Sequence, residues 1–250
     1  MTIKNPTSTQ IPALQRLWQQ AFGDDDSFLG YFFSTAFSPD RCLCIPAEDA
    51  VAAALYWLDC SCRGEKLAYL YAVATDENHR GKGLCHALMA ETHKTLKNLG
   101  YAGAVLVPGS ESLFRFYENM GYATFGGMDK FTAYAETPSA YLRKIDPEEY
   151  AALRKTYLSE GSVLQENATL AFLQTQADFY AGEDFLLVAA EDGKQLICPE
   201  FLGNRQACGH ILSALGKTDG QFRAPGQENF AMYHPLSSAQ PPSYFGLALD

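Results

Sequence analysis

The short basic stretch at residues 80 to 83, Arg-Gly-Lys-Gly, is the first feature of this chain that could do chemistry. Glycine lets the backbone approach a ligand closely, and the first amides of a helix have no partner inside that helix. If a helix begins after Gly83, its amides, its dipole and the side chains of Arg80 and Lys82 together favour an anion. The stretch therefore predicts a site for a phosphate or a pyrophosphate.

The second such feature is Tyr117, in a segment that we expect to form a short helix from residue 110 to the helix-ending Gly121. A phenol can donate a proton to a leaving group at neutral pH. A tyrosine that simply packs in a helix explains the residue as well. The residues alone leave both interpretations open.

The elements around these residues are predicted to be strand, turn, helix and strand. Residues 67 to 74 are almost wholly apolar or aromatic without helical spacing, which is typical of a strand covered on both faces. Residues 83 to 98 form an amphipathic helix with His86 and His93 on its solvent face, and residues 102 to 107 form a second buried strand. This order of strand, helix and strand predicts a right-handed crossover between two parallel strands. The carboxyl ends of both strands then face the turn.

Residues 80 to 85, Arg-Gly-Lys-Gly-Leu-Cys, resemble the acetyl-CoA pyrophosphate loop of the GNAT superfamily of N-acetyltransferases. That loop has the pattern Gln/Arg-x-x-Gly-x-Gly/Ala, which this chain meets at Arg80 and Gly83, with the small residue Cys85 at the last position. The match gains weight because it lies at a strand-to-helix junction and a second block follows at the right distance. By this resemblance acetyl-CoA is the co-substrate, and its binding residues are Val73, Ala74, Thr75, Arg80, Gly81, Lys82, Gly83, Leu84, Cys85, His86 and Ser110.

The second block is residues 110 to 122, which resemble the family pattern Asn-x-x-Ala-x-x-Phe-Tyr-Glu-x-x-Gly-Phe. Ser110 stands in the place of Asn and Leu113 in the place of Ala. The resemblance assigns to Tyr117 the donation of a proton to the departing thiolate, a role that fits a free thiol pKa of about 8.5. It also implies that backbone amides at residues 73 to 75 hold the pantetheine arm and the thioester oxygen.

The resemblance implies an α/β protein with the GNAT fold, in which helices flank a mixed, mostly antiparallel sheet. We expect a catalytic, acetyl-CoA-binding domain at residues 1–136, closed by a hairpin at residues 123 to 135, and a second, degenerate GNAT-like domain at residues 140–250. The second half repeats the order of elements with losses, and residues 206 to 211 echo Gln-x-x-Gly. This doubling is similar to that of tandem acetyltransferases.

The acidic run Asp24, Asp25 and Asp26 separates two predicted helices in the first half. Carboxylates suit a helix start, and this capping interpretation is favoured over attraction of a substrate amine. Further helices are predicted at residues 9–23, 147–158, 167–180 and 205–215. Further strands are predicted at residues 41–45, 50–58, 185–190, 195–200, 220–223, 230–234 and 244–249.

The net charge of −10 argues against a nucleic-acid binder, because counterion release needs clustered Lys and Arg. It fits a cationic acceptor, although acidity that only keeps a protein in solution explains it too. The N-terminus lacks the apolar core of a signal peptide, and the longest apolar run, residues 50 to 58, is too short to cross a bilayer. We expect a cytoplasmic protein that binds neither nucleic acid nor membrane.

The seven cysteines are an odd number without a secretory context and indicate reduced thiols. Cys42 with Cys44 and Cys60 with Cys62 raise the possibility of zinc. On the expected strands the two pairs would lie ~20 Å apart. Small buried cysteines explain the spacing, and we expect no metal.

The function that these features predict is transfer of acetyl from acetyl-CoA to a primary amine by direct attack. A lysine-like amine loses its proton at pH 7 at a cost of about 4.6 kcal/mol, and residues 67 to 74 offer no carboxylate to take it. The candidate bases are Tyr69, Tyr71, His79, the carboxylate of Asp250 and a water chain. Two alternatives stay open: a non-catalytic CoA-binding module, and an aminoacyl or peptidyl transferase on a tandem scaffold, against which the acidic balance speaks.

Overall fold

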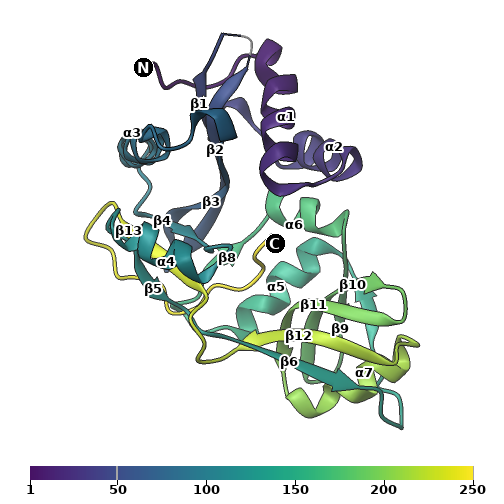
Figure 1. The fold of residues 1–250 in the computed structure, drawn as a ribbon. Helices are drawn as coiled ribbons and strands as arrows, with labels where there is room; N and C mark the ends of the chain where they lie inside the picture. The colour runs from purple at the N-terminus through teal and green to yellow at the C-terminus, as the bar shows by residue number, and fades with distance from the viewer. Residues whose placement is uncertain (49, 250) are drawn as a thin grey trace.

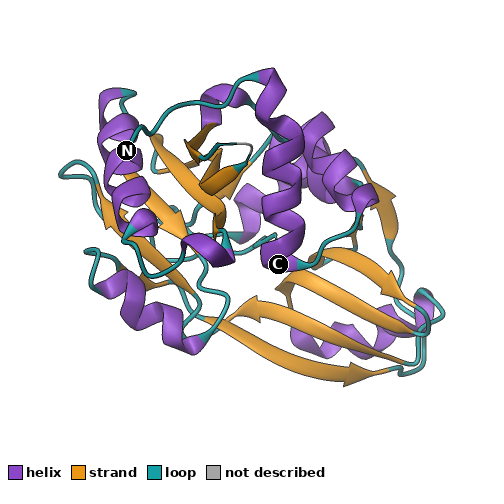
Figure 2. Ribbon diagram, turned by 45° about the horizontal axis from the view of Figure 1, so that its top comes forward, coloured by secondary structure: helices purple, strands orange, loops and turns teal. Residues whose placement is uncertain are grey.

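The computed structural model describes residues 1–48 and 50–249. These residues form two mixed sheets flanked by helices, so the predicted α/β class is confirmed (Figures 1 and 2). The elements of the first half are η1 (Ser8–Gln10), α1 (Ile11–Phe22), α2 (Asp26–Thr35), η2 (Pro39–Arg41), β1 (Cys42–Pro46), β2 (Val51–Cys62), β3 (Glu65–Thr75), η3 (Glu77–His79), α3 (Leu84–Asn98), β4 (Gly103–Leu106), α4 (Glu111–Glu118) and β5 (Ala123–Phe125). Those of the second half are β6 (Met128–Tyr134), β7 (Arg143–Ile145), α5 (Pro147–Tyr157), β8 (Leu164–Gln165), α6 (Ala168–Gln174), β9 (Asp178–Ala181), β10 (Phe185–Asp192), β11 (Gln195–Gly203), η4 (Arg205–Ala207), α7 (Cys208–Ala214), β12 (Asp219–Pro225) and β13 (Ala231–Pro235).

The first sheet has the strand order β1-β2-β3-β4-β13-β5, and the short strand β8 pairs with β2. β1, β2 and β3 form the predicted antiparallel meander. β3 and β4 are parallel and are joined through α3, as the crossover rule predicts. The predicted order of strand, turn and helix is therefore confirmed, and the phosphate site at the turn stays a prediction.

Helices cover both faces of the first sheet. Along β2, Tyr56 packs in the same apolar core as α1 and α2, whereas Leu55 and Trp57 pack in the core with α3. This alternation follows from the two-residue repeat of a strand. At the start of α2, the Asp25 carboxylate accepts a hydrogen bond from the Phe28 amide (2.8 Å), so the capping interpretation holds for this residue.

The second sheet, in the order β6-β12-β11-β10-β9-β7, repeats the plan of the first. β9, β10 and β11 are antiparallel neighbours, and β11 and β12 are a parallel pair joined through α7. The plan is the same as that of β1, β2, β3, α3 and β4. This repetition supports the prediction of a degenerate GNAT-like second half, which stays a prediction.

The two sheets exchange strands, and the predicted hairpin at residues 123 to 135 is wrong. β5 pairs with β13 in the first sheet, whereas β6 pairs with β12 in the second. The two connections meet at Gly127 and Gly226, where a Cβ added to Gly127 would lie 2.2 Å from the Gly226 carbonyl oxygen. Two alternating strands joined by glycines look like a hairpin in the sequence, but each has a better partner about a hundred residues away. The division at residues 136 to 140 stays a prediction. The first sheet takes β8 and β13 from beyond it, and the second sheet takes β6 from before it.

Two more predicted elements differ from the structure. The helix predicted at residues 167 to 180 ends at Gln174, and residues 178 to 181 form β9, with Phe179 and Ala181 buried in a period-two pattern. The strand predicted at residues 244 to 249 is absent from the described chain apart from a single bridge between Ser162 and Tyr244. Side chains rather than a sheet ladder hold this segment.

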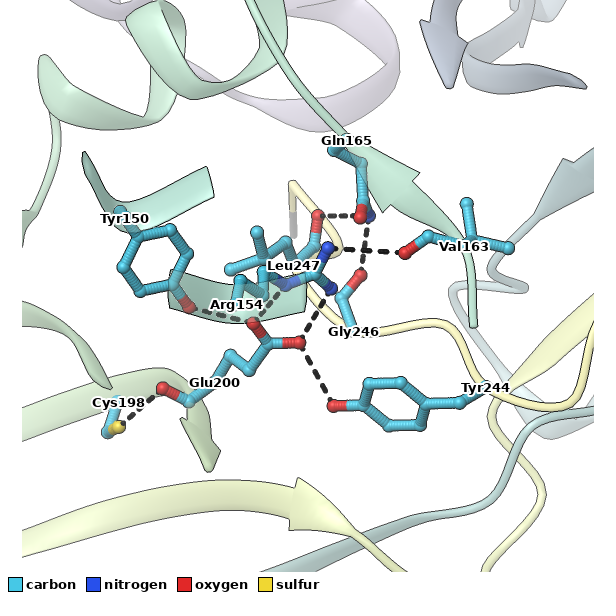
Figure 3. Close-up of polar contacts among 9 residues, drawn as sticks. All are labelled: Tyr150, Arg154, Val163, Gln165, Cys198, Glu200, Tyr244, Gly246 and Leu247. Carbon is cyan, nitrogen blue, oxygen red and sulfur yellow. Dashed lines mark hydrogen bonds and ion pairs between the residues drawn. The ribbon is translucent and has the colours of Figure 1, made fainter. Parts of the chain in front are cut away.

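A buried ion pair holds the segment that follows β13 (Figure 3). Arg154 of α5 binds Glu200 of β11 through two hydrogen bonds of 2.6 and 2.8 Å. Tyr150 and Tyr244 donate their hydroxyl protons to the same carboxylate at 2.7 and 3.1 Å. The carboxylate is fully buried, and the four donors replace the water that it gives up.

The same segment is anchored at two further points (Figure 3). Gln165 of β8 donates to the Gly246 carbonyl oxygen at 2.7 Å. The Val163 amide donates to the Tyr244 carbonyl oxygen at 2.8 Å. The Leu249 amide also donates to the Tyr69 hydroxyl oxygen at 3.2 Å, so residues 244 to 249 contact both halves of the chain, and we call them the strap.

His93 does not lie on the solvent face of its helix as predicted. Its ring stacks on His234 of β13 with centroids 4.0 Å apart, and its Nε2 lies 2.8 Å from the Tyr122 hydroxyl. Burial, followed by the neighbouring His234, lowers the pKa of His93 to about 4. The periodicity of α3 put this position outside because β13, which covers it, arrives from far along the chain.

Replacing Arg154 by Met leaves the Glu200 carboxylate buried without its counter-charge. We expect the free energy of unfolding in urea to fall by about 3 to 5 kcal/mol. The matched control is Arg143→Met, which removes the exposed pair between Arg143 and Glu149 and should leave the free energy of unfolding nearly unchanged. Equal losses in the two variants would contradict a structural role for the buried pair.

Protonation of His93 should destabilise the fold on acidification. Its pKa is 6.5 ordinarily and about 4 when folded, so between these pH values the unfolded chain binds more protons and stability falls as pH falls. His93→Gln should reduce the loss of unfolding free energy between pH 7 and pH 4 by about 2 to 3 kcal/mol. His86→Gln, which removes an exposed imidazole from the same helix, is the control. A loss as steep in His93→Gln as in the wild type would refute the assignment.

Candidate active site

The parallel strands β3 and β4 part at their carboxyl ends. Their pairing covers three residues on each strand and ends at Tyr69 opposite Val105, whereas β3 continues to Thr75. Ala72, with a positive φ of 48°, lies where β3 carries one residue more than β2. Such a bulge bends its strand and leaves backbone groups outside the ladder. The facing edges beyond Tyr69 can therefore accept an extended ligand.

A turn with two left-handed glycines follows β3. Gly81 and Gly83 have φ of 74° and 73°, and nothing lies within 4 Å of the place where a Cβ would be. The hydrogen bond from the Ala87 amide to the Gly83 carbonyl oxygen (3.1 Å) opens α3, so the amides before Ala87 have no partner within the helix. The turn thus presents open backbone donors at the positive end of a helix dipole.

The basic side chains of the turn are exposed and lie along it. The Arg80 Nε donates to the Thr75 carbonyl oxygen (3.2 Å), and the Lys82 Nζ donates to the Asn78 carbonyl oxygen (3.0 Å). These bonds use only part of the donor capacity of either group. Both cations remain available to an anion at the turn.

The predicted coenzyme residues around the turn differ in exposure. Ala74 is buried and pairs with Ala54 of β2, while Thr75 is half-buried at the end of β3. Leu84 and Cys85 are half-buried beneath the start of α3, and burial raises the pKa of the Cys85 thiol to about 11. His86 is exposed, with its ring edge against Phe116 of α4.

Tyr117 lies on α4 with only 7% of its surface exposed. Its ring packs edge-on against Phe116 and Tyr122. Burial, with a smaller contribution from the nearby Cys85, raises the pKa of Tyr117 well above its ordinary value. The phenol therefore keeps its proton throughout the neutral range.

A cavity of about 470 Å³ lies at the parted strands and Tyr117, and none of residues 74 to 86 lines it. Val73 of β3, Leu106 of β4 and Tyr117 line one side of it. Ser110 lies outside it, at the start of α4, where its hydroxyl is 3.0 Å from that of Ser112. Ser110 opens instead onto an adjoining cavity of about 590 Å³ that shares Val107 and Gly109 with the first.

Most of the other residues that line the 470 Å³ cavity were not singled out by the sequence. Trp18 and Phe28 come from the α1–α2 region, Phe172 and Leu173 from α6, and Leu249 from the strap. Apolar side chains at helical spacing carry the same signal whether they line a cavity or fill a core. No local pattern could have assigned them to the site.

The acidic run contributes one carboxylate to this cavity. Asp24 lines it and accepts a hydrogen bond from the Trp18 Nε1 at 2.7 Å. Asp25 caps α2, and Asp26 accepts from the Gln19 Nε2 at 2.6 Å. The three neighbours therefore have three different roles.

The candidate bases differ in whether they line the cavity. Tyr69 and Tyr71 line the cavity, and the Tyr69 hydroxyl oxygen accepts a hydrogen bond from the Leu249 amide at 3.2 Å. His79 lies 2.8 Å from the Asp76 carboxylate and does not line the cavity. Asp250 lies outside the described residues.

The four cysteines whose spacing suggested a zinc site are all buried: Cys42, Cys44, Cys60 and Cys62. Across residues 1–48 and 50–249, no three side chains of His, Cys, Asp or Glu come together as metal ligands. In the same residues, no helix combines the length and the apolar character that crossing a bilayer requires.

Comparison with known families identifies the class to which this site belongs. Residues 2–125, which contain the parted strands, the turn and Tyr117, match the family model of the acetyltransferase (GNAT) domain. This chain thus belongs to the GNAT family and is a GNAT-type acetyltransferase. No curated protein matches its sequence significantly.

Solved structures extend the similarity of fold over both halves. A GCN5-related N-acetyltransferase from Anabaena variabilis is 14% identical with a TM-score of 0.73, over 94% of this chain and 72% of that one. Eis1 from Mycobacterium abscessus is 10% identical with a TM-score of 0.65, over 94% and 74%. A GCN5-related N-acetyltransferase from Sphaerobacter thermophilus is 12% identical with a TM-score of 0.58, over 98% of both chains. At such identities the similarity concerns the fold alone.

Proposed function

We propose that this protein transfers the acetyl group of acetyl-CoA to a primary amine by direct attack. The observation that carries the proposal is the convergence on one cavity of the parted ends of β3 and β4 and the buried phenol of Tyr117. The turn with open amides follows β3 directly and leads into α3. Membership of the GNAT acetyltransferase family supports the same reaction. The catalytic unit in this proposal is residues 1–136, completed by β13.

The coenzyme would be held mostly by backbone. Its pantetheine arm would add to the open edge of β3 as an extra strand, with the amides of residues 73 to 75 as donors. Its pyrophosphate would lie against Gly81, Lys82, Gly83 and the first amides of α3, at the positive end of the helix dipole. The Arg80 guanidinium would add a second positive charge there.

The chemistry needs one bond to form and one to break. The neutral amine nitrogen attacks the thioester carbon, and amide donors from β3 stabilise the negative charge that develops on the oxygen. The carbon–sulfur bond then breaks, and Tyr117 gives its proton to the leaving sulfur. The amine releases its surplus proton to solvent, from which the tyrosine recovers its own.

Removal of the phenol proton tests this role. Tyr117→Phe keeps the buried ring but cannot donate, so kcat in a thiol-release assay should fall about 100-fold while calorimetry gives an unchanged Kd for acetyl-CoA. The control is Tyr134→Phe, because Tyr134 is 70% exposed on β6, outside both cavities. Turnover by Tyr117→Phe at the wild-type rate would exclude Tyr117 as the proton donor.

Substitution of a left-handed glycine tests the turn. Gly83→Val strains the backbone and turns the amides away, so the affinity for acetyl-CoA should fall at least about tenfold. Gly64→Val is the matched control: its φ of 77° and open surroundings are the same, but it lies in the β2–β3 turn at the far end of β3. Both variants should lose about 1 to 2 kcal/mol of stability. Equal coenzyme affinities in the two variants would show that the turn does not hold the pyrophosphate.

A further inference from the structure

We propose that the acceptor is a primary amine with a single positive charge on an apolar alkyl or aryl-alkyl body. Its ammonium group binds at Asp24 and loses one proton to solvent before the neutral nitrogen attacks the thioester. This inference rests on the proposed acetyl transfer and names the substrate class for it. The observation behind it is the chemistry of the cavity wall opposite Tyr117. Among the described residues that line this cavity, Asp24 is the sole charged side chain.

The carboxylate of Asp24 is well placed to hold an ammonium ion. One of its oxygens accepts the Trp18 Nε1 hydrogen at 2.7 Å, which fixes the orientation of the group and leaves the second oxygen for a ligand. The rings of Trp18, Phe22 and Phe28 line the cavity beside it, with Trp18 at 5.9 Å from Phe22 and 6.3 Å from Phe28 between centroids. Aromatic faces next to a carboxylate favour a cation.

The body of the acceptor would lie against apolar surface from the second half of the chain. Phe172, Leu173 and Ala177 of the α6 region line the cavity there, and Ala248 and Leu249 of the strap complete that wall. Figure 1 shows α6 lying below α2, between the first half and the second sheet. Gln176 is the one polar side chain among the described residues of the α6 region that line the cavity, so this wall mainly suits alkyl and aromatic groups.

Hydrogen bonds at both ends hold the strap in this wall. The Leu249 amide donates to the Tyr69 hydroxyl oxygen at 3.2 Å, and the Glu200 carboxylate holds Tyr244 at the start of the strap. Gly246 passes so close to Glu200 that an added Cβ would lie 1.8 Å from its Oε1. The second half therefore shapes the acceptor side of the cavity through a fixed segment.

The same lining disfavours other amines. A carboxylate or phosphate on the acceptor would enter a cavity whose described residues include no Lys, Arg or His. Among the described residues that line the cavity, a second ammonium group would find no carboxylate of its own, because Asp24 is already used. Burying an unpaired charge is strongly unfavourable, so amino acids and polyamines should be poor acceptors.

Two pairs of matched amines test the proposed acceptor class, in assays of the full chain with saturating acetyl-CoA. 2-Phenylethylamine and L-phenylalanine share one body, and the second adds a carboxylate; hexylamine and 1,6-diaminohexane differ by one ammonium group. We expect kcat/KM to favour phenylethylamine about 100-fold, although an α-amino group loses its proton more readily. Hexylamine should be favoured about tenfold over the diamine. Equal or reversed preferences in either pair would overturn the proposal.

Variants of the acidic run test the role of Asp24 as the cation site. Asp24→Asn keeps an acceptor for the Trp18 hydrogen and should raise KM for 2-phenylethylamine about tenfold with little change in kcat. Asp26→Asn, in the same loop but bonded to Gln19, is the control and should leave KM unchanged. The loss in Asp24→Asn should be smaller for the β,β-difluoro analogue of phenylethylamine, which is much less basic. An equal loss for both amines would point to a structural effect and overturn the role of Asp24 as a cation site.

Coenzyme binding separates failure of this inference from failure of the proposed function. If the chain binds acetyl-CoA and prefers polar or multiply charged amines, acetyl transfer stands and the apolar monoamine class is wrong. If acetyl-CoA binds and no amine in the panel is acetylated, both proposals fall.

Discussion

The parting of β3 and β4 is the constraint on which the rest of the site depends. Parallel strands normally satisfy one another along their length, but here the ladder ends at Tyr69 and Val105, and the bulge at Ala72 bends β3 where β4 stops. Unpaired backbone groups inside a protein need partners. The opening therefore invites a ligand with amide groups of its own, and α3 begins at its mouth with free donors for an anion. Both parts of a CoA-like ligand thus find complementary backbone without any designated side chain.

The exchange of strands makes the two halves one structure. β13 completes the first sheet and β6 completes the second, so neither sheet is finished by its own half of the chain. The same return path brings His234 onto His93 and leads on to the strap, which the buried pair of Arg154 and Glu200 holds in place. The second half therefore completes the first sheet and lines the cavity of the first half.

The division of polarity in the cavity explains how one fold can serve both ligands. In the proposed function, the coenzyme would meet backbone donors and the exposed cations Arg80 and Lys82 at the turn, whereas the acceptor would meet the aromatic and aliphatic lining of the cavity with Asp24 as its carboxylate. An excess of acidic residues over the whole chain says little about this arrangement. Only one carboxylate of the acidic run lines the cavity among the described residues. Asp25 caps α2, and Asp26 accepts a hydrogen bond from Gln19.

The sequence by itself determined the parts of this protein whose interactions are local. The meander of β1 to β3, the crossover through α3, the left-handed glycines at 81 and 83 and the short helix with Tyr117 all follow from residues that are neighbours in the chain. Only the tertiary structure decided which strand lies beside β4, where β5 and β6 find partners, and which side chains face Tyr117 across the cavity. Those outcomes join residues such as Phe28 and Phe172, or Tyr69 and Leu249, that are more than a hundred positions apart. Apolar periodicity tells that a side chain is buried, but the partner is chosen by packing and pairing energies summed over the whole fold.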